Sequence, residues 1–456
     1  MATKEELEDF ERAYNWLFSF VTDPEGKRYR IKKTIAQRRA EMEGSIPQMA
    51  DFLAFAGHPE RKIPSIHVTG TSGKGSVSMM TDAILQGMGL RTGLHISPYL
   101  QLPTEKLMTN GVPLSPKGFV ELVRSFRKVH EAWATADGPY TKLRYTQAWT
   151  ALTFMWLAQQ NLDVAVVESG MGGRFDYTNL MPSEIAIITN VAFDHVMSLG
   201  PELTDIAWHK AGIMKQNKPA ITGVTEPELL PILEKEAAEK NSKLYVLDRD
   251  FSFEVHDVNT ITVNAPYKTY EYVKVGPVGR YQLGNAALAI VALDVLVAEG
   301  KLEGPVKTAA LANFSCPGRM EQVSQNPTIL LDGAHNPHKM DALISSVSEA
   351  FPNKKIISII GFIGNKEVND IVDVLLPAVD EVIVTVPNVP GKAPADPEKI
   401  LEKIKETSDI PVSLSPNINA AIDCAKILAT PDDLILITGS LYLVGEAREL
   451  WYPMKA

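Results

Sequence analysis

The chain has 456 residues, which is too long for one hydrophobic core and predicts two or three domains. Its 55 acidic and 45 basic residues give a net charge of −10, which argues against a nucleic-acid or anionic-membrane partner. With only two cysteines, Cys316 and Cys424, neither a disulfide framework nor a cysteine zinc cluster can form. No run approaches the roughly 18 apolar residues of a membrane span, and the charged N-terminus does not look like a signal peptide. We therefore expect a cytoplasmic protein.

The N-terminal region is predicted to be helical. Apolar residues at helical spacing predict an amphipathic helix over residues 5–20 and a second helix over 48–55. Between them, residues 27–39 are rich in lysine and arginine. We interpret this basic run as a solvated face, with an anion site as the alternative.

A glycine-rich stretch, His-Val-Thr-Gly-Thr-Ser-Gly-Lys-Gly-Ser, joins a predicted strand over 64–68 to a predicted helix over 77–88. Such a turn aims backbone N–H groups and the positive end of a helix at one anion. Its lysine adds a mobile cation, and its last serine adds a hydroxyl that could bind Mg²⁺. An ordinary strand-to-helix turn is the alternative, but a lysine between two glycines has little structural use there. We predict an ATP-binding phosphate loop made of Gly70, Thr71, Ser72, Gly73, Lys74, Gly75 and Ser76.

Two later strands bring polar residues to the same predicted sheet edge. Residues 90–96 form a strand that ends before Ser97, and the apolar run 162–167 reads as a buried parallel strand that ends at Glu168. A carboxylate at this position, followed by glycines, is hard to explain by packing. It is well suited to bind Mg²⁺ beside a triphosphate.

The following elements carry two residues with ordinary local interpretations. A predicted strand over 185–191 leads to His195, and a predicted helix over 204–215 carries Lys210. A histidine at a strand end is often structural, and a lysine on a helix normally faces solvent. The residues alone leave both alternatives open.

The second half of the chain contains two further kinds of predicted structure. Alternating apolar and polar residues predict short antiparallel strands between 251 and 275, followed by an alanine-rich helix to about residue 298. After a linker at 300–304, strands and helices alternate, which predicts a smaller doubly wound α/β domain. We therefore divide the chain into domains 1–300 and 301–456.

The form T-G-T-x-G-K-G-S of the phosphate loop resembles that of the folylpolyglutamate synthase and dihydrofolate synthase family within the Mur ligase superfamily. This resemblance implies an N-terminal P-loop-type ATPase domain with a mainly parallel sheet and a C-terminal Rossmann-like α/β domain. Further motifs continue it in the family's order: His95-Ile96-Ser97-Pro98-Tyr99-Leu100, Glu168-Ser169-Gly170-Met171-Gly172-Gly173-Arg174, Asp194-His195, His209-Lys210-Ala211-Gly212-Ile213, Pro317-Gly318-Arg319, Leu331-Asp332-Gly333-Ala334-His335-Asn336-Pro337 and Ile437-Thr438-Gly439-Ser440-Leu441-Tyr442.

The resemblance implies two Mg²⁺ sites. Ser97 and Glu168 would hold the first ion beside the triphosphate. His195 and Lys210 would hold the second, with Lys210 carbamylated so that the amine becomes a carboxylate-like ligand. Together with Lys74, His195 and Lys210 are then catalytic residues.

Four further roles are implied for residues nearer the C-terminus. Asn285 would lie near the adenine, although an asparagine at a helix start is also a common cap. Arg319 would contact phosphate, Asp332 the ribose, and the catalytic residue His335 the incoming amino acid.

The implied reaction joins L-glutamate to a folate or dihydropteroate carboxylate through an acyl phosphate, using ATP. The chain departs from the family at Lys106 and at the pair Thr146-Gln147. Lys106 stands where an arginine is more common; a lysine keeps the positive charge but cannot bind a carboxylate through two parallel hydrogen bonds as an arginine does. Thr146-Gln147 stand where the family has a Phe-Glu pair. A related ligase with a non-folate acceptor or a different amino acid is therefore an alternative, and an inactive nucleotide-binding module is another. Small-molecule substrates and a monomer are expected, without nucleic acid or membrane.

Overall fold

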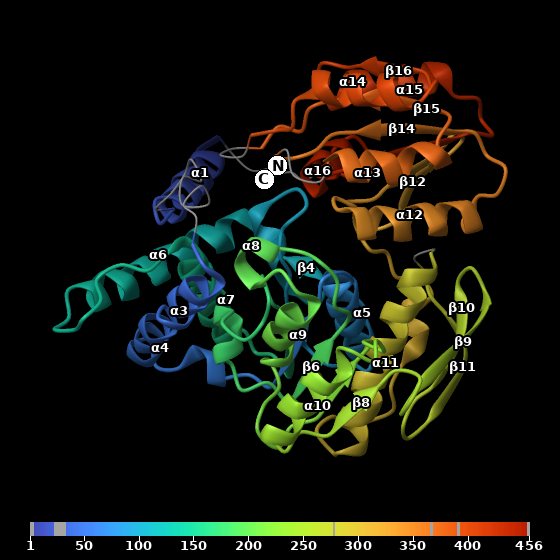
Figure 1. The fold of residues 1–456 in the computed structure, drawn as a ribbon. Coiled ribbons are helices and arrows are strands. Elements are labelled where there is room, and N and C mark those ends of the chain that lie inside the picture. The colour runs from blue at the N-terminus through green and yellow to red at the C-terminus, as the bar shows by residue number, and fades with distance from the viewer. Residues whose placement is uncertain (1–3, 22–32, 277–278, 365–367, 390–392, 454–456) are drawn as a thin grey trace.

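The computed structural model describes residues 4–21, 33–276, 279–364, 368–389 and 393–453 (Figure 1). Its strands form an eight-stranded, a three-stranded and a six-stranded sheet. The six-stranded sheet belongs to the C-terminal part of the chain, drawn from orange to red in Figure 1. The predicted α/β fold, with a second and smaller α/β unit, is confirmed.

The eight-stranded sheet brings the predicted strand ends together. Its order is β4-β3-β2-β5-β1-β6-β7-β8, with β1 (Ser65–Thr69), β5 (Val164–Glu168) and β6 (Ile185–Ile188) at the centre. These central strands are parallel and wholly buried, which explains their near-continuous apolar sequences. Their carboxyl ends therefore share one edge, where β1 pairs Val68 with Glu168. The remaining strands are β2 (Thr92–His95), β3 (Leu107–Thr109), β4 (Val112–Pro113), β7 (Ala220–Thr222) and β8 (Leu244–Val246).

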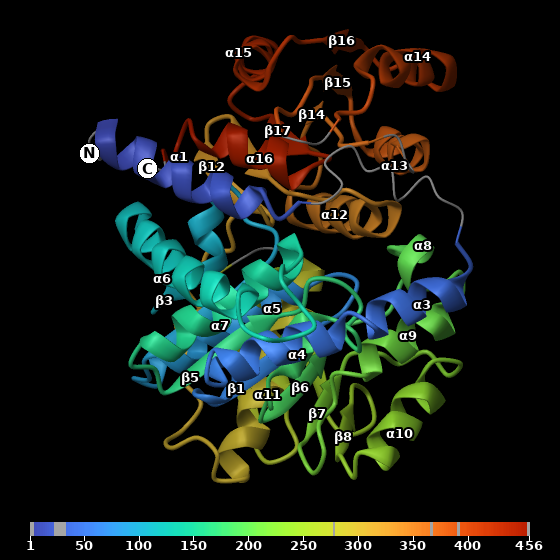
Figure 2. The same cartoon turned by 90° about the vertical axis from the view of Figure 1, so that its left-hand side faces the viewer.

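Helices cover both faces of this sheet. On one face, α5 (Lys74–Gly87) and α11 (Arg280–Ala298) share a hydrophobic cluster with β1. On the other face a second cluster contains the helices α1 (Lys4–Phe18), α4 (Ile46–Phe55), α6 (Pro116–Ala134) and α7 (Tyr145–Gln159). Figure 2 shows α1 lying over α6, on the side that faces the C-terminal part. The other N-terminal helices are α3 (Ile35–Glu43), α8 (Val196–Leu199), α9 (Leu203–Ala211) and α10 (Leu230–Glu239), with short 3₁₀ turns η1 (Pro59–Arg61), η2 (Pro103–Lys106), η3 (Tyr177–Leu180) and η4 (Thr308–Leu311).

Helix α11 corrects one sequence expectation. By length and composition it could cross a membrane, whereas we expected no run to approach that limit. In the structure 78% of its apolar window is buried inside the protein. The sequence pattern of α11 is therefore that of a core helix.

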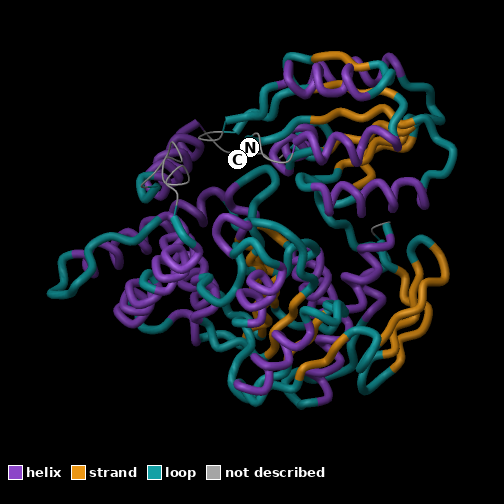
Figure 3. The backbone as a smooth tube through the Cα atoms, in the orientation of Figure 1, coloured by secondary structure: helices purple, strands orange, loops and turns teal. Residues whose placement is uncertain are grey.

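The three predicted antiparallel strands form a separate small sheet, visible at the edge of the molecule in Figure 3. They are β9 (Ser252–Asp257), β10 (Thr260–Asn264) and β11 (Thr269–Lys274), with β10 in the middle. This sheet packs against α11 and places Phe251 and Phe253 near the residues that follow β8. It thus forms one side wall of the cavity described below.

The C-terminal sheet has the order β12-β13-β17-β14-β15-β16, and only β12 is antiparallel to its neighbour. Its strands are β12 (Glu321–Gln325), β13 (Thr328–Leu331), β14 (Ile356–Ile360), β15 (Glu381–Val384), β16 (Val412–Leu414) and β17 (Leu434–Thr438). Its helices are α12 (Pro337–Ala350), α13 (Val368–Leu375), η5 (Leu376–Ala378), α14 (Pro397–Thr407), α15 (Ile418–Leu428) and α16 (Leu441–Arg448). The alternation of strands and helices agrees with the predicted Rossmann-like unit.

The segment that connects the two large sheets packs against the N-terminal core. Val306, Leu311 and Phe314 contact the cluster that contains α5 and α11, and Gly276 donates its N–H to the carbonyl of Leu311. The division of the chain at residue 300 stays a prediction.

The interpretation of the basic run at 27–39 as a solvated face is wrong for Arg39, which makes specific contacts. Residues 27–32 lie outside the described residues, but Arg39 is not simply solvated. Its guanidinium donates to Asp205 at 2.6 Å and stacks over the ring of Trp208 at 4.7 Å. Arg39 therefore joins α3, which the sequence did not predict, to α9.

The core on the α6 face gives a stability prediction. Phe126 is fully buried among Trp16, Phe20 and Phe52, so Phe126→Ala leaves a large cavity. We expect the unfolding free energy of the N-terminal part to fall by about 3–5 kcal/mol. Urea denaturation followed by tryptophan fluorescence measures this loss. Phe55→Ala is the matched control, because Phe55 is 47% exposed and its loss leaves no buried void; equal effects of the two changes would contradict the packing described here.

Candidate functional site

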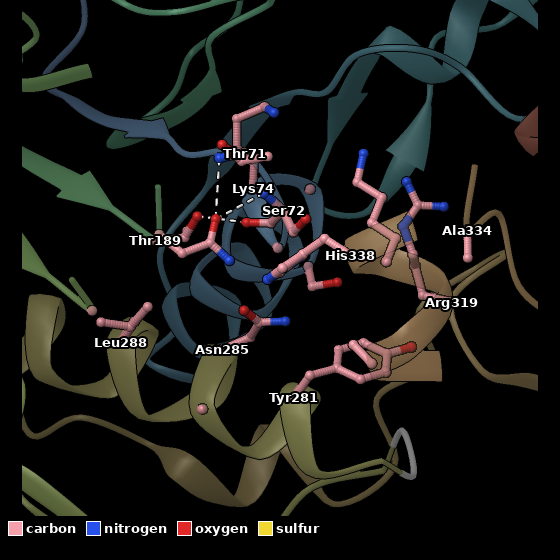
Figure 4. Close-up of a pocket in the computed structure, with 18 of the residues that line it drawn as sticks. Thr71, Ser72, Lys74, Thr189, Tyr281, Asn285, Leu288, Arg319, Ala334 and His338 are labelled. Atoms are coloured by element: carbon pink, nitrogen blue, oxygen red, sulfur yellow. Dashed lines mark hydrogen bonds between the residues drawn. The ribbon is translucent and has the colours of Figure 1, made fainter. Parts of the chain in front are cut away.

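A cavity of about 440 Å³ lies between the two α/β units. Figure 4 shows Thr71, Ser72 and Lys74 of the phosphate loop on one side of it, Tyr281 and Asn285 of α11 on another, and Arg319 and Ala334 from the C-terminal part opposite. Most of the sequence-predicted site residues line this cavity: Thr71, Ser72, Gly73, Lys74, Gly75, Ser76, Ser97, Glu168, His195, Asn285, Arg319, Asp332 and His335.

The phosphate loop is held in shape by the end of β6. Asn190 accepts from the backbone N–H groups of Thr71 and Ser72 at 3.1 and 2.9 Å, and Thr189 donates to the carbonyl of Ser72. Gly73 has φ +81°, and a Cβ there would collide with the amide of Asn285. Helix α5 then begins at Lys74, earlier than predicted, so its first N–H groups face the cavity.

Lys74 and Ser76 differ in how they face this cavity. The ammonium of Lys74 donates to the carbonyl of Gly70 at 2.9 Å, which folds the side chain back over the loop. Ser76 is buried, and its hydroxyl lies 3.6 Å from the thiol of Cys316. The loop therefore offers a cation and open N–H groups to an anion.

Ser97 and Glu168 lie together, as the shared sheet edge predicts. Glu168 accepts from the backbone N–H of Ser97 at 2.9 Å, and its carboxylate faces Gly75. Burial raises the pKa of Glu168, while the nearby cation of Lys74 opposes that shift. Among the described residues, no group of three or more His, Cys, Asp or Glu side chains is arranged to hold a metal. One carboxylate and a serine fit a Mg²⁺ that takes its other ligands from phosphates and water.

His195 and Lys210 occupy neighbouring elements. His195 stands before α8 in the left-handed region with φ +50°, and more than half of its side chain is exposed. Its Nε2 lies 3.7 Å from a carboxylate oxygen of Asp194. Lys210 is buried on α9 and is not among the residues that line the cavity. Burial, then the cation of Lys74, lowers the pKa of Lys210 well below its ordinary value, which favours the neutral amine that carbamylation requires.

The C-terminal wall holds Asp332 firmly. Its two oxygens accept from the N–H groups of Met320 and Ala334 and from the hydroxyl of Tyr281. Burial raises the pKa of Asp332. This carboxylate therefore organises the start of the C-terminal unit as well as facing the cavity.

His335 forms a pair with a lysine that the sequence did not single out. The Nδ1 of His335 donates to the carbonyl of Gly333 at 2.7 Å, which leaves Nε2 to accept from Lys339 at 3.1 Å. Burial, then the cation of Lys339, lowers the pKa of His335 to about 3, so this imidazole is neutral. Asn336 caps α12, and that helix places Lys339 one turn after His335.

Sequence reasoning also missed the apolar end of the cavity. Leu247, Phe251, Phe253 and Leu288 line it beside Asn285. These residues come from a loop, the small sheet and α11, so no local pattern marks them as one surface. Among the cavity residues that the sequence analysis did not predict, Lys339 alone has a local signal: it lies four residues after His335 at the start of a helix, a spacing that brings two side chains together.

The two departures from the family have structural explanations. The side chain of Gln147 is buried, accepts from the N–H of Arg144, and donates to the carbonyl of Ser45. A glutamate could not make that donation when ionised. Lys106 places its ammonium 4.4 Å from the ring centre of Trp149. Neither residue is among those that line the cavity.

Comparisons with known proteins agree with the motifs. The model of the Mur ligase middle domain matches residues 68–293, and that of the Mur ligase glutamate ligase domain matches residues 318–441. The folylpolyglutamate synthase of Lacticaseibacillus casei is 32% identical, with 90% of this chain and 95% of that protein covered. The dihydrofolate synthase/folylpolyglutamate synthase of Mycobacterium tuberculosis is 28% identical, with 92% and 93% covered.

Solved structures show the same likeness. The Mycobacterium tuberculosis folylpolyglutamate synthase complexed with ADP superposes with a TM-score of 0.84 at 27% identity, covering 98% of this chain and 99% of that one. The Escherichia coli FolC structure with DHPP and ADP gives 0.79 at 26% identity, covering 92% and 97%. The resemblance seen in the sequence is confirmed, and the chain belongs to the folylpolyglutamate synthase and dihydrofolate synthase family of ATP-dependent Mur ligases.

Proposed function

We propose that this chain joins L-glutamate to the carboxylate of a folate or dihydropteroate and consumes ATP. The observation that carries the proposal is the interdomain cavity, where the phosphate loop, Glu168 and His335 face one another. The L. casei and M. tuberculosis relatives are named for these activities, and the E. coli structure holds DHPP and ADP.

The residues around the cavity suggest a route through an acyl phosphate. The phosphate loop and Lys74 bind the triphosphate, and Arg319 and Lys339 add positive charge from the opposite wall. An oxygen of the acceptor carboxylate attacks the γ-phosphorus, and the bond to ADP breaks. The amino group of glutamate then attacks the acyl carbon beside His335, an amide bond forms, and inorganic phosphate leaves with the proton lost to solvent. Closure of the two units around the cavity keeps water from the acyl phosphate.

Mg²⁺ belongs to this proposal at two positions. When bound, such ions neutralise the charge that develops on the transferred phosphoryl group and on the attacked carbonyl. Ser97 and Glu168 would hold the first, and His195 with a carbamylated Lys210 would hold the second. Burial lowers the pKa of Lys210, which favours the neutral amine that carbamylation requires and supports this arrangement, although the nearby carboxylate of Asp194 opposes the shift. We place the reaction in the cytoplasm and expect a monomer that acts only on small molecules.

The direct test is phosphate release from ATP and Mg²⁺ with L-glutamate, in parallel reactions with dihydropteroate, tetrahydrofolate or no acceptor. We expect release that depends on a pteridine acceptor and on glutamate. If neither pteridine stimulates release while ATP still binds, the folate acceptor is wrong, and a panel of other acceptors and amino acids follows. If ATP binds but no acceptor ever stimulates release, the inactive nucleotide-binding module is the better interpretation.

Lys339 gives a pH-dependent prediction. Burial and the nearby cation of Lys74 lower the pKa of Lys339 to about 8, although Asp194 and Glu168 favour its charge. Its charge is therefore present below pH 8 and is lost as the pH rises, so ATP affinity falls between pH 7 and pH 9. Lys339→Met should bind ATP about tenfold more weakly at pH 7 and lose most of this slope. Titration of a fluorescent ATP analogue at fixed Mg²⁺ measures both effects; an unchanged slope in the variant would assign the titration to another group.

A further inference from the structure

One loop of the N-terminal part is docked onto the last helix of the C-terminal part. This docking loop, residues 96–102, follows β2 and carries Ser97. The side chain of Leu100 packs against a hydrophobic cluster of the C-terminal sheet and its helices. A Cβ on Gly445 of α16 would collide with the carbonyl oxygen of Leu100, so only a glycine lets the helix approach the loop this closely. The two parts of the chain are therefore in direct backbone contact at this point.

The docking loop is held in shape by Glu105, which follows it in η2. The buried carboxylate of Glu105 accepts from the backbone N–H groups of Leu100, Gln101 and Leu102 at 2.7 to 3.3 Å. Three consecutive N–H groups on one carboxylate fix the path of the backbone. A displacement at Gln101 is therefore transmitted along the loop toward Ser97.

The side chain of Gln101 joins the docking loop to α16 and to the residues after it. Its amide nitrogen donates to a carboxylate oxygen of Glu449 at 2.6 Å and to the carbonyl of Tyr452 at 2.9 Å. Its amide oxygen accepts from the guanidinium of Arg448. One side chain of the N-terminal part thus makes three hydrogen bonds to the C-terminal part.

Arg448 extends this connection to the turn that carries Arg319. The Nε of Arg448 lies 3.0 and 2.9 Å from the two carboxylate oxygens of Glu321. Only 14% of the Arg448 side chain and 4% of the Glu321 side chain are exposed. Glu321 also accepts from the N–H of Gly318 at 2.9 Å, immediately before Arg319. The chain of contacts from Gln101 through Arg448 to Glu321, called the polar bridge below, therefore links the docking loop to the turn of Arg319.

Both segments joined by the polar bridge bring a residue to the reaction cavity, Ser97 from one side and Arg319 from the other. Apolar packing such as that of Leu100 holds two surfaces together without fixing their register, whereas directional hydrogen bonds do fix it. Gln101 itself is not among the residues that line the cavity. Its three hydrogen bonds therefore act on the cavity only through the segments that they align.

We propose that Gln101 is a positioning residue, which through Arg448 fixes the register between the docking loop and the turn of Arg319. This inference rests on the proposed function and adds to it a residue remote from the substrates. The proposed reaction needs groups from both parts of the chain on one substrate complex, and its rate depends steeply on their alignment. Binding of ATP to the phosphate loop and α11 does not involve the polar bridge, so its loss affects the rate far more than ATP affinity.

The first test is Gln101→Met, which removes the amide and keeps a side chain of similar length. The pair between Arg448 and Glu321 stays within the C-terminal part, so the change leaves no isolated buried charge. The matched control is Gln159→Met, because Gln159 is exposed at the end of α7.

The second test, Gly445→Ala, disturbs the same contact from the other side. Alanine favours a helix more than glycine does, but the added Cβ pushes the carbonyl of Leu100 away from α16. The matched control is Gly138→Ala, because Gly138 is exposed and a Cβ there meets no atom within 4 Å. If Gly445→Ala does not fold, Gln101→Met alone decides the test.

Three measurements are made on each protein. Phosphate release with saturating pteridine acceptor and glutamate gives kcat and the KM for ATP, and a fluorescent ATP analogue gives the affinity. Hydrogen–deuterium exchange follows the docking loop, with β1 as the internal reference. We expect both variants to lower kcat about tenfold to a hundredfold, because a misplacement of about 1 Å costs that much, while ATP affinity stays within about twofold. Amide exchange in the docking loop should become about fivefold faster or more, with β1 and both controls unchanged.

Wild-type kcat in Gln101→Met would overturn the positioning role and leave the proposed function standing. So would a fall in kcat that is matched by equal losses of ATP affinity and thermal stability, because it would show a general loss of structure. No pteridine stimulation in the wild-type protein would overturn the proposed function, and this inference with it.

Discussion

Lys74→Ala should abolish acceptor-dependent phosphate release, with a fall in kcat of at least about a thousandfold. Lys74 opens α5 from a loop whose Thr71 and Ser72 N–H groups are already taken by Asn190. In the proposed mechanism, the triphosphate would therefore depend on the ammonium of Lys74 and on the first N–H groups of the helix. Removing the ammonium also removes the charge that opposes the raised pKa of Glu168, so the carboxylate ionises less readily.

Single-turnover phosphate release with saturating acceptor and glutamate measures this loss. Lys128→Ala, an exposed lysine on α6, is the matched control and should retain full activity. Lys74→Arg keeps the charge in a bulkier group, so we expect partial activity. Retention of more than a tenth of the wild-type rate by Lys74→Ala would show that the loop does not bind the transferred phosphate.

The sequence was most informative where the chemistry depends on consecutive residues or on strand ends. The phosphate loop is one continuous segment, and Glu168 ends a strand whose apolar run marks it as buried and parallel. Parallel strands share a carboxyl edge, so the sequence alone predicts that Ser97 and Glu168 lie together, as they do in the structure. The family assignment depended on the same continuous motifs.

The rest of the site depends on tertiary packing. The apolar run of β6 predicts a buried strand but does not show that Asn190, just after it, shapes the loop. The apolar wall includes Phe251 and Leu288, which come from distant segments. Lys339 looks like a solvent lysine until α12 is seen to face the cavity across from Lys74. Gln147 also needed the tertiary structure: from the sequence it is only a missing carboxylate, whereas in the structure its amide belongs to a local buried hydrogen-bond network.

Glu168→Gln should separate function from stability at one residue. The glutamine keeps an oxygen that can accept from the N–H of Ser97, so the local geometry survives. The negative charge is lost, and with it the hard ligand proposed for Mg²⁺. We expect kcat to fall by about a hundredfold to a thousandfold and the Mg²⁺ concentration for half-maximal activity to rise about tenfold. The matched control is Glu131→Gln, because Glu131 pairs with Arg127 on the exposed face of α6.

The same substitution should make the protein free of substrates more stable at neutral pH. The folded-state pKa of Glu168 lies above its unfolded value, so its ionisation opposes folding, and wild-type stability falls as the pH rises through that range. Glutamine never ionises and avoids this loss. We therefore expect a melting temperature about 2–4 °C above wild type at pH 7.5, with a difference that shrinks as the pH approaches 4.5. Thermal unfolding at both pH values, with Glu131→Gln beside it, checks this trend. A variant that is both inactive and less stable would mean that the charge of Glu168 holds the fold together, and its assignment to substrate and metal binding would be wrong.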